Sequence, residues 1–170
     1  MSTQNVKLYA YNYNQLKTYM VALLFTAGNI ILPQLCHLMP QGGLIWLPIY
    51  FFTLVAAYKY GWKAGLLTAM LSPVINSVAF GMPATSMLPI ILIKSLLLAS
   101  AAGYAAYKFK SFSLLTVAAV VVAYQVAGSL IEWAISGSLV AALQDIRLGL
   151  PGILVQIFGG YLFIKYLIGK

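Results

Sequence analysis

The stretch LPIILIKSLLLAS, residues 88–100, sets one lysine, Lys94, among apolar and small residues. Continued to residue 108, the segment is long enough to cross a membrane, because a spanning helix needs about 20 mostly apolar residues. A charged side chain in the middle of such a helix costs roughly 2.5–3.5 kcal/mol on insertion scales. We therefore expect Lys94 to face a cavity or a partner inside the protein.

The composition of the whole chain also indicates a membrane location. Of the 170 residues, 62% are hydrophobic and only 7% are charged. A soluble domain carries about 25% charged residues, so this chain has too few polar side chains to cover a surface in water. We expect an all-α integral membrane protein in which residues 1–170 form one domain. The first fifteen residues are polar and aromatic, so we expect no cleavable signal peptide.

Six segments have the length and apolar character of transmembrane helices. They cover residues 16–39, 44–60, 63–82, 88–108, 112–136 and 147–168. Proline, glycine and lysine residues mark most of the breaks between them. The longest break, from Ser136 to Arg147, contains SLVAALQDIR, which has the pattern of a short amphipathic turn. Asp145 lies in this break, and we expect it to be an ordinary loop residue.

The positive charges separate the two sides of this bundle of six transmembrane helices. The side that holds both termini has eight lysines, and the opposite side has only Arg147. Because positive residues are enriched in cytoplasmic loops, we expect the N and C termini to be cytoplasmic. The net charge of +8 is then a sign of topology and of contact with anionic lipid, not of nucleic-acid binding. The eight residues are Lys7, Lys17, Lys59, Lys63, Lys108, Lys110, Lys165 and Lys170.

Polar residues within the predicted helices concentrate in the outer half, away from the termini. Gln125, Gly128, Ser129 and Glu132 repeat at i, i+3, i+4 and i+7, which places them on one helix face. Polar faces of membrane helices look into the bundle, so we expect them to line a cavity that opens outward. The residues expected to bind a substrate there are Lys94, Glu132, Asn76, Gln125, Trp133, Gln156, Asn29 and His37.

Each of these features also has a structural interpretation. Stripes of small residues are most often helix-packing surfaces, and Lys94 can pair with Glu132 as a structural tie. His37 can be a solvated helix-end residue, and Trp133 can belong to an interfacial aromatic belt. The sequence contains no H-x₃-H or C-x₂-C spacing and no phosphate-binding or catalytic motif. We therefore expect no metal, no cofactor and no enzymatic activity.

In size and layout the chain resembles the substrate-binding S component of an energy-coupling factor (ECF) vitamin transporter. The resemblance lies in MVALLFTAGNIILPQL (residues 20–35), in PIYFFTLVAAYKYGWKAGLLTAMLSPVINSVAFGMP (residues 48–83), and in a long fifth break before a last helix rich in glycine. It implies capture of a water-soluble vitamin or precursor near the outer face of a bacterial or archaeal cell (inner) membrane. It also implies a transmembrane T subunit and two ATPase subunits as partners, which use the ATP.

The resemblance further implies roles for single residues. S components dock through small residues of the first helix, and the matching positions here are Ala22, Thr26 and Ala27. In some members the first loop is a lid, and the matching stretch is 37–46. Lys94 would hold an anionic oxygen of the substrate. Glu132 would accept a hydrogen bond from a ring amine or hydroxyl, and Trp133 would stack on a ring. Further donors and acceptors of the substrate would be satisfied by Asn76, Gln125 and Gln156.

Two other functions stay open on the sequence. The chain can be a self-sufficient, oligomeric small channel or gradient-driven carrier. It can also be an assembly or sensor protein whose polar groups only join helices together. The combination of Lys94 with Glu132 favours a zwitterionic or weakly acidic small molecule as the substrate.

Overall fold

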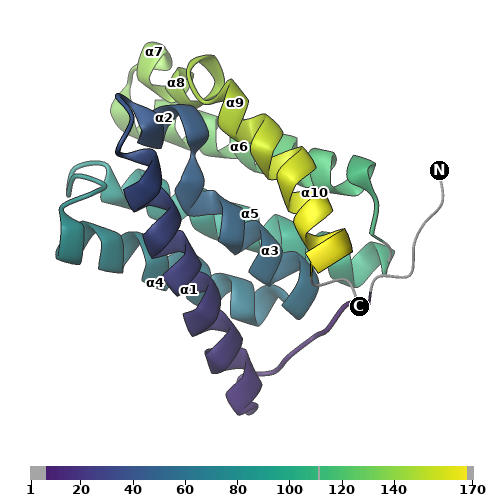
Figure 1. Cartoon of the computed structure of the whole chain (residues 1–170). Coiled ribbons are helices and arrows are strands. Elements are labelled where there is room, and N and C mark those ends of the chain that lie inside the picture. The colour runs from purple at the N-terminus through teal and green to yellow at the C-terminus, as the bar shows by residue number, and fades with distance from the viewer. Residues whose placement is uncertain (1–6, 111, 168–170) are drawn as a thin grey trace.

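The computed structural model describes residues 7–110 and 112–167, and these residues form helices and loops without a β-strand. Lys170, counted above among the lysines, lies outside this range. Among the described residues, four helices are long and apolar enough to cross a membrane. They are α1 (Leu16–Cys36), α4 (Trp62–Phe80), α5 (Leu88–Phe109) and α6 (Leu114–Ser136). The expectation of an all-α membrane protein is confirmed at this level (Figure 1).

The second expected helix is interrupted. Residues 44–60 were predicted to be continuous, but the structure has α2 (Gly42–Trp46), a 3₁₀ turn η1 (Pro48–Tyr50) and α3 (Phe51–Tyr60). Leu47 between them has φ 46° and ψ 46°, the left-handed conformation. Proline disfavours helical backbone at the residue before it, so Pro48 explains why the helix cannot run through Leu47. The uninterrupted helix is therefore a wrong prediction.

The last helical segment contains turns of two kinds. It runs through α9 (Leu150–Leu154), a π-helical turn η2 (Val155–Gly159), α10 (Gly160–Leu162) and a second π-helical turn η3 (Phe163–Leu167). Pro151 lies in the first turn of α9. Proline is tolerated there because an N–H at this position would have no acceptor within the helix. Of the helical segment predicted over 147–168, the described part is helical from Leu150 to Leu167, and residue 168 lies outside the described residues.

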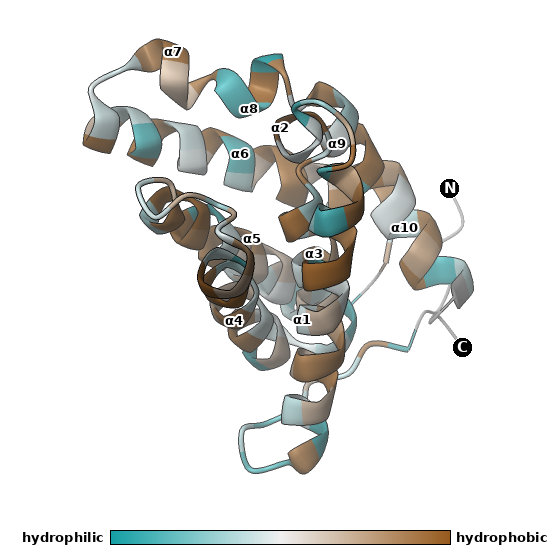
Figure 2. Ribbon diagram, turned by 60° about the vertical axis from the view of Figure 1, so that its left-hand side comes forward, coloured by the Kyte–Doolittle hydropathy of each residue, from teal (hydrophilic) through white to brown (hydrophobic). Residues whose placement is uncertain are grey.

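Two short helices fill the break between α6 and α9. They are α7 (Leu139–Ala142) and α8 (Gln144–Arg147), so the predicted helical turn in this break is confirmed. The Ser138 side chain caps α7 by accepting a hydrogen bond from the N–H of Ala141 at 3.3 Å. Figure 2 shows α7 and α8 lying over the end of α6. We call α7 and α8 together the α7–α8 cover. It places α8, which is rich in polar residues, against the bundle.

Helix α3 lies at the centre of the core. Its residues 54–58 are fully buried, and it packs against α1, α4 and α5. Glycine permits two of the closest helix contacts: a Cβ on Gly65 would lie 2.3 Å from Cβ of Ala57, and one on Gly103 would lie 2.3 Å from Cβ of Trp62. Small residues of this kind let membrane helices approach closely. The core is thus held by close backbone approach as well as by large side chains.

The two ends of the bundle differ in what covers them. At one end, residues 7–15 run beside the end of α3, where the N–H of Tyr9 donates to the carbonyl of Lys59 at 2.8 Å. The N–H of Tyr11 donates to the carbonyl of Tyr60 at 3.2 Å in the same way. The short helices α2, α7 and α8 gather at the opposite end (Figures 1 and 2). The candidate site lies at that second end.

Candidate functional site

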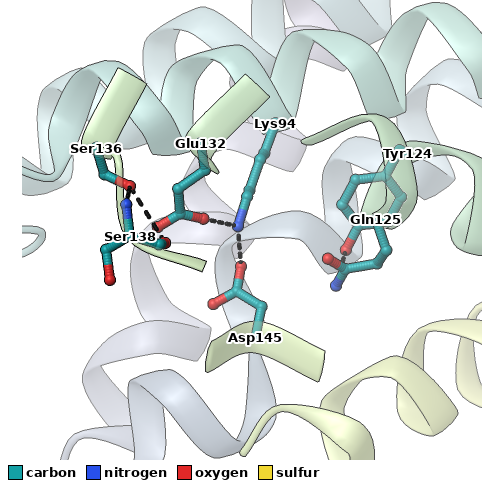
Figure 3. Close-up of polar contacts among 7 residues, drawn as sticks. All are labelled: Lys94, Tyr124, Gln125, Glu132, Ser136, Ser138 and Asp145. Carbon is teal, nitrogen blue, oxygen red and sulfur yellow. Dashed lines mark hydrogen bonds and ion pairs between the residues drawn. The ribbon is translucent and has the colours of Figure 1, made fainter. Parts of the chain in front are cut away.

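Lys94 contacts both acidic side chains that the sequence contains (Figure 3). Its ammonium nitrogen Nζ donates to Oε2 of Glu132 and to Oδ2 of Asp145, each at 2.6 Å. The three residues come from α5, α6 and α8, and Lys94 is only 2% exposed. We call Lys94, Glu132 and Asp145 the ion-pair cluster. Of the two expected surroundings of Lys94, a cavity or a partner, the structure shows partners: Glu132, which was considered from the sequence, and Asp145, which was not.

The helix faces explain why Lys94 and Glu132 meet. On α5, Lys94 shares a buried stripe with Leu98 and Ala102. On α6, the predicted stripe from Gln125 to Glu132 is buried as expected. Gly128 makes room for the lysine, because a Cβ at that position would lie 2.7 Å from Cγ of Lys94. The close approach of α6 to the Lys94 side chain therefore depends on glycine.

The ion-pair cluster has an excess of negative charge. Two carboxylates and one ammonium leave one net negative charge when all three groups are ionised. Buried charges need close partners, and removing one partner of a buried pair costs about 3–5 kcal/mol. The ammonium can donate three hydrogen bonds and uses two here. The arrangement is therefore suited to a guest that brings a positive charge to the carboxylates.

Two buried polar atoms on the same face of α6 have no hydrogen-bond partner among the described residues. They are Oγ of Ser129 and Oε1 of Gln125. Ser129 lies three residues before Glu132, which places both side chains on the same face of the helix. Since buried polar atoms generally have a partner, these two oxygens have capacity for a polar ligand group.

A second polar cluster joins α6 to the last helical segment. The hydroxyl of Tyr124 donates to Oε1 of Gln156 at 2.7 Å, and Nε2 of Gln125 donates to that hydroxyl at 3.1 Å. Nε2 of Gln156, in the π-helical turn, donates to the carbonyl of Leu47 at 3.5 Å. In Figure 3 Tyr124 and Gln125 lie to one side of Lys94. The predicted residues Gln125 and Gln156 thus meet each other through Tyr124, next to the ion-pair cluster.

Asn29 and Asn76 belong to a third polar cluster, between α1, α3 and α4. Asn29 donates to Oγ1 of Thr53 at 2.9 Å and to Oγ of Ser72 at 3.2 Å, and it accepts from the N–H of Phe52 at 3.1 Å. Asn76 donates to the carbonyls of Asn29 and Ser72, both at 2.9 Å. No hydrogen bond in the described part of the chain links these residues to the ion-pair cluster. Both amides are used in joining helices, so the structure does not bring them to the predicted pocket.

His37 and Trp133 lie on the surface. His37 follows the last turn of α1, and its ring packs on Gly43, where a Cβ would lie 2.6 Å from Cε1. Trp133 is 47% exposed, because the residue next to Glu132 on a helix faces another direction. Neither side chain lines the ion-pair cluster, which corrects the expectation that Trp133 stacks on a ligand there.

The small residues expected to dock a partner divide between two faces of α1. Ala22 and Thr26 are buried, and Oγ1 of Thr68 donates to the carbonyl of Ala22 at 3.4 Å. Ala27 is exposed. Ala22 and Thr26 therefore serve the contact between α1 and α4 in this conformation, and only Ala27 is available on the surface.

Lys94, around which a hollow was expected, is shielded from solvent in this conformation, with only 2% of its side chain exposed. The structure contains a cavity of about 940 Å³ at the end covered by residues 8–12, and one of about 430 Å³ beside α7 and α8. Neither of these two is lined by the ion-pair cluster. Asp145 on α8 contacts Nζ of Lys94 (Figure 3). The first loop, with α2, packs on α9 instead, where a Cβ on Gly152 would lie 2.4 Å from the carbonyl carbon of Trp46.

The sequence interpretation missed Asp145. It assigned this residue to an ordinary loop, although a chain with two acidic residues and a lysine inside a predicted helix has few ways to neutralise that lysine. Comparing the number of acidic residues with the need to neutralise Lys94 could have identified Asp145 from the sequence. In the described ranges 7–110 and 112–167, no group of three His, Cys, Asp or Glu side chains is arranged to hold a metal ion.

Comparison with known proteins assigns no family to this arrangement. No family model matches the chain, and neither a curated protein nor a solved structure matches it. The function is therefore inferred from the geometry of the ion-pair cluster and from the helices that carry it.

Proposed function

We propose that this chain captures a small water-soluble molecule at the ion-pair cluster and acts as the S component of an ECF-type importer. The observation that carries the proposal is the meeting of both acidic side chains with one buried lysine, between α5, α6 and the α7–α8 cover. Such a concentration of charge in an apolar chain is a functional-site hypothesis by default, because charged groups within membrane segments are costly. The guest is a vitamin or precursor that bears an ammonium group.

Exchange of ion pairs explains how a closed cluster can accept a guest. Opening the cover without a guest would separate Asp145 from Lys94, which would keep only its ion pair with Glu132. A guest ammonium takes the place of Nζ on one carboxylate, and an acidic oxygen of the guest can occupy Lys94. Oγ of Ser129 and Oε1 of Gln125 accept further donors from the guest. The number of paired charges is thus preserved during exchange.

The proposed topology has six membrane segments with cytoplasmic termini in a bacterial or archaeal cell (inner) membrane. Residues 42–60 and 150–167 supply two spans beyond the four long helices, and both segments are helical but interrupted. The distribution of lysines supports this orientation, since positive residues prefer the cytoplasmic side. The ion-pair cluster then lies near the external face. A T subunit and two ATPase subunits would provide the energy for import.

Native mass spectrometry of the gently purified chain tests ligand capture. We expect an adduct of a small amine-bearing molecule on the wild-type protein. Asp145→Asn and Glu132→Gln should reduce its occupancy at least tenfold, because truncating one partner of a buried charge pair costs about 2–5 kcal/mol. Arg147→Gln, a charge change on the same short helix, is the matched control and should keep the adduct. Equal occupancy in all four proteins would overturn the proposal.

Proteoliposomes distinguish capture from the alternative of a self-sufficient channel or carrier. The compound identified by mass spectrometry is placed outside vesicles that contain this chain alone. We expect binding without accumulation inside, because transport in this proposal needs ATPase partners. Accumulation by the chain alone would establish the carrier function instead.

A further inference from the structure

The cavity of about 940 Å³ lies at the end of the bundle opposite the ion-pair cluster. Its walls come from residues 8–12, from the start of α4 and from the last turns of α5. The side chains that determine its chemistry are Asn12, Trp62, Lys63, Tyr104, Tyr107 and Lys110. It is therefore lined by lysines together with large aromatic side chains.

The charge of the cavity is entirely positive. Lys63 and Lys110 line it, and Nζ of Lys7 and of Lys59 lie 5.3 and 5.4 Å from the ring centre of Tyr9, another lining residue. Both acidic side chains of the sequence are held by Lys94 at the other end. No carboxylate side chain can neutralise these lysines, so the cavity is complementary to an anion.

The start of α4 adds a second feature that favours an anion. Gly61, Trp62 and Lys63 line the cavity, and the N-terminus of α4 has no side-chain cap. The first N–H groups of a helix lack helical acceptors and lie at the positive end of its dipole, which is a common way to bind phosphate. Gly61 has φ +99°, and a Cβ there would lie 3.2 Å from the Tyr9 carbonyl oxygen, so glycine lets residues 8–12 approach this helix end.

Lys110 supports the same inference through its backbone. It ends α5 with φ 47° and ψ 18°, the left-handed conformation that glycine adopts most easily at this position. A lysine in this conformation is uncommon. At a position where glycine is preferred, the chain thus has a lysine, which adds positive charge to the cavity wall.

We propose that this cavity binds the headgroup of an anionic phospholipid. The phosphate contacts Lys63, Lys110 and the first N–H groups of α4, and the acyl chains lie along the exposed aromatic side chains of Tyr104 and Tyr107. Aromatic residues at membrane interfaces and basic residues near anionic headgroups have these roles in general. The inference does not depend on the proposed transport function. It needs only this cavity to lie at a membrane surface.

Thermal unfolding of the full chain in detergent, with added short-chain lipids, tests the proposal. We expect phosphatidylglycerol to raise the melting temperature at a lower concentration than phosphatidylcholine. Lys63→Gln with Lys110→Gln should raise the half-saturating concentration of phosphatidylglycerol by roughly tenfold to thirtyfold, since each lysine near an anionic headgroup contributes about a factor of five. Lys17→Gln with Lys165→Gln, which removes two lysines that do not line the cavity, is the control and should change it little.

A single variant separates lipid binding from folding. Lys110→Gly removes a cavity charge but suits the left-handed conformation, so we expect a higher melting temperature without lipid and a smaller lipid-induced shift. Equal shifts with phosphatidylcholine, or an unchanged phosphatidylglycerol response in Lys110→Gly and in the cavity double variant, would overturn the proposal. A glycerol phosphate response as large as that of phosphatidylglycerol at equal concentration would also overturn it, by indicating a site for a soluble phosphate.

Discussion

Lys94 shows how one side chain can determine the stability of this protein. It is almost completely buried, and each of its two ion pairs measures 2.6 Å. Lys94→Met should destabilise the chain by about 3–5 kcal/mol, because the buried Glu132 and the partly buried Asp145 would lose their common counter-ion. Unfolding in detergent measures this loss.

A neutral version of the ion-pair cluster separates charge from packing. The variant that combines Lys94→Met, Glu132→Gln and Asp145→Asn has no buried charge left unpaired. It should recover most of the stability lost in Lys94→Met, since neutral replacement of buried ion pairs is often tolerated. If Lys94→Met alone is as stable as wild type, the ion pairs make no contribution to folding.

Gly128 gives a steric test of the same residue. Alanine would normally strengthen a helix by about 1 kcal/mol relative to glycine. Here its Cβ would lie 2.7 Å from Cγ of Lys94, so we expect Gly128→Ala to be destabilising by about 1–3 kcal/mol. Ala123→Val adds volume on the exposed side of the same helix and should change stability by less than about 0.5 kcal/mol. Equal effects of the two variants in thermal unfolding would contradict the steric explanation.

At the scale of elements, we expect the α7–α8 cover to open more readily than the rest of the site, because its two helices have only four residues each. Helix α8 has four residues, and its contact with Lys94 is made by Asp145. Asp145→Asn should raise amide hydrogen exchange in residues 139–147, while exchange in the core helix α3 stays unchanged. Arg147→Gln, on the same short helix, is the control. Exchange in the cover that is the same in both variants would show that Asp145 does not hold it.

Most helices could be predicted because each is apolar over a whole membrane thickness. The bounds of α1, α4, α5 and α6 agree with the sequence within three residues, since polar or turn-forming residues stand at their ends. The interruption at Leu47 was missed because hydropathy averages over it. Pro48 could have predicted the interruption, because a proline disfavours helical backbone at the residue before it.

The site was less predictable than the helices. The cost of a charge in an apolar segment correctly predicted that Lys94 is buried, and helical periodicity correctly placed Glu132 on a buried face. It could not bring in Asp145, because a loop that folds back has no periodicity. Position along the predicted helices gave the depth of Asn29 and Asn76 in the membrane, but not which neighbouring helices they face. In the structure both amides join α1, α3 and α4.

For the whole molecule, the separation of charges predicts its orientation in the membrane. In a Cys36→Ser background, Ala84→Cys lies in the loop after α4 and Lys108→Cys lies near the end of α5, at opposite ends of the bundle. A membrane-impermeant maleimide should label Ala84→Cys in intact cells and Lys108→Cys only after permeabilisation. The reverse pattern would invert the proposed topology.

If the proposed function holds, the surplus carboxylate of the ion-pair cluster would couple the protein to membrane voltage. In the proposed orientation the empty cluster carries one net negative charge near the outside of a cell whose interior is negative. Carrying that charge inward would cost about 2.3 kcal/mol for each 100 mV crossed. A guest with one net positive charge would cancel this charge and let the loaded site move without electrical work, whereas a zwitterionic guest would leave the surplus negative charge in place.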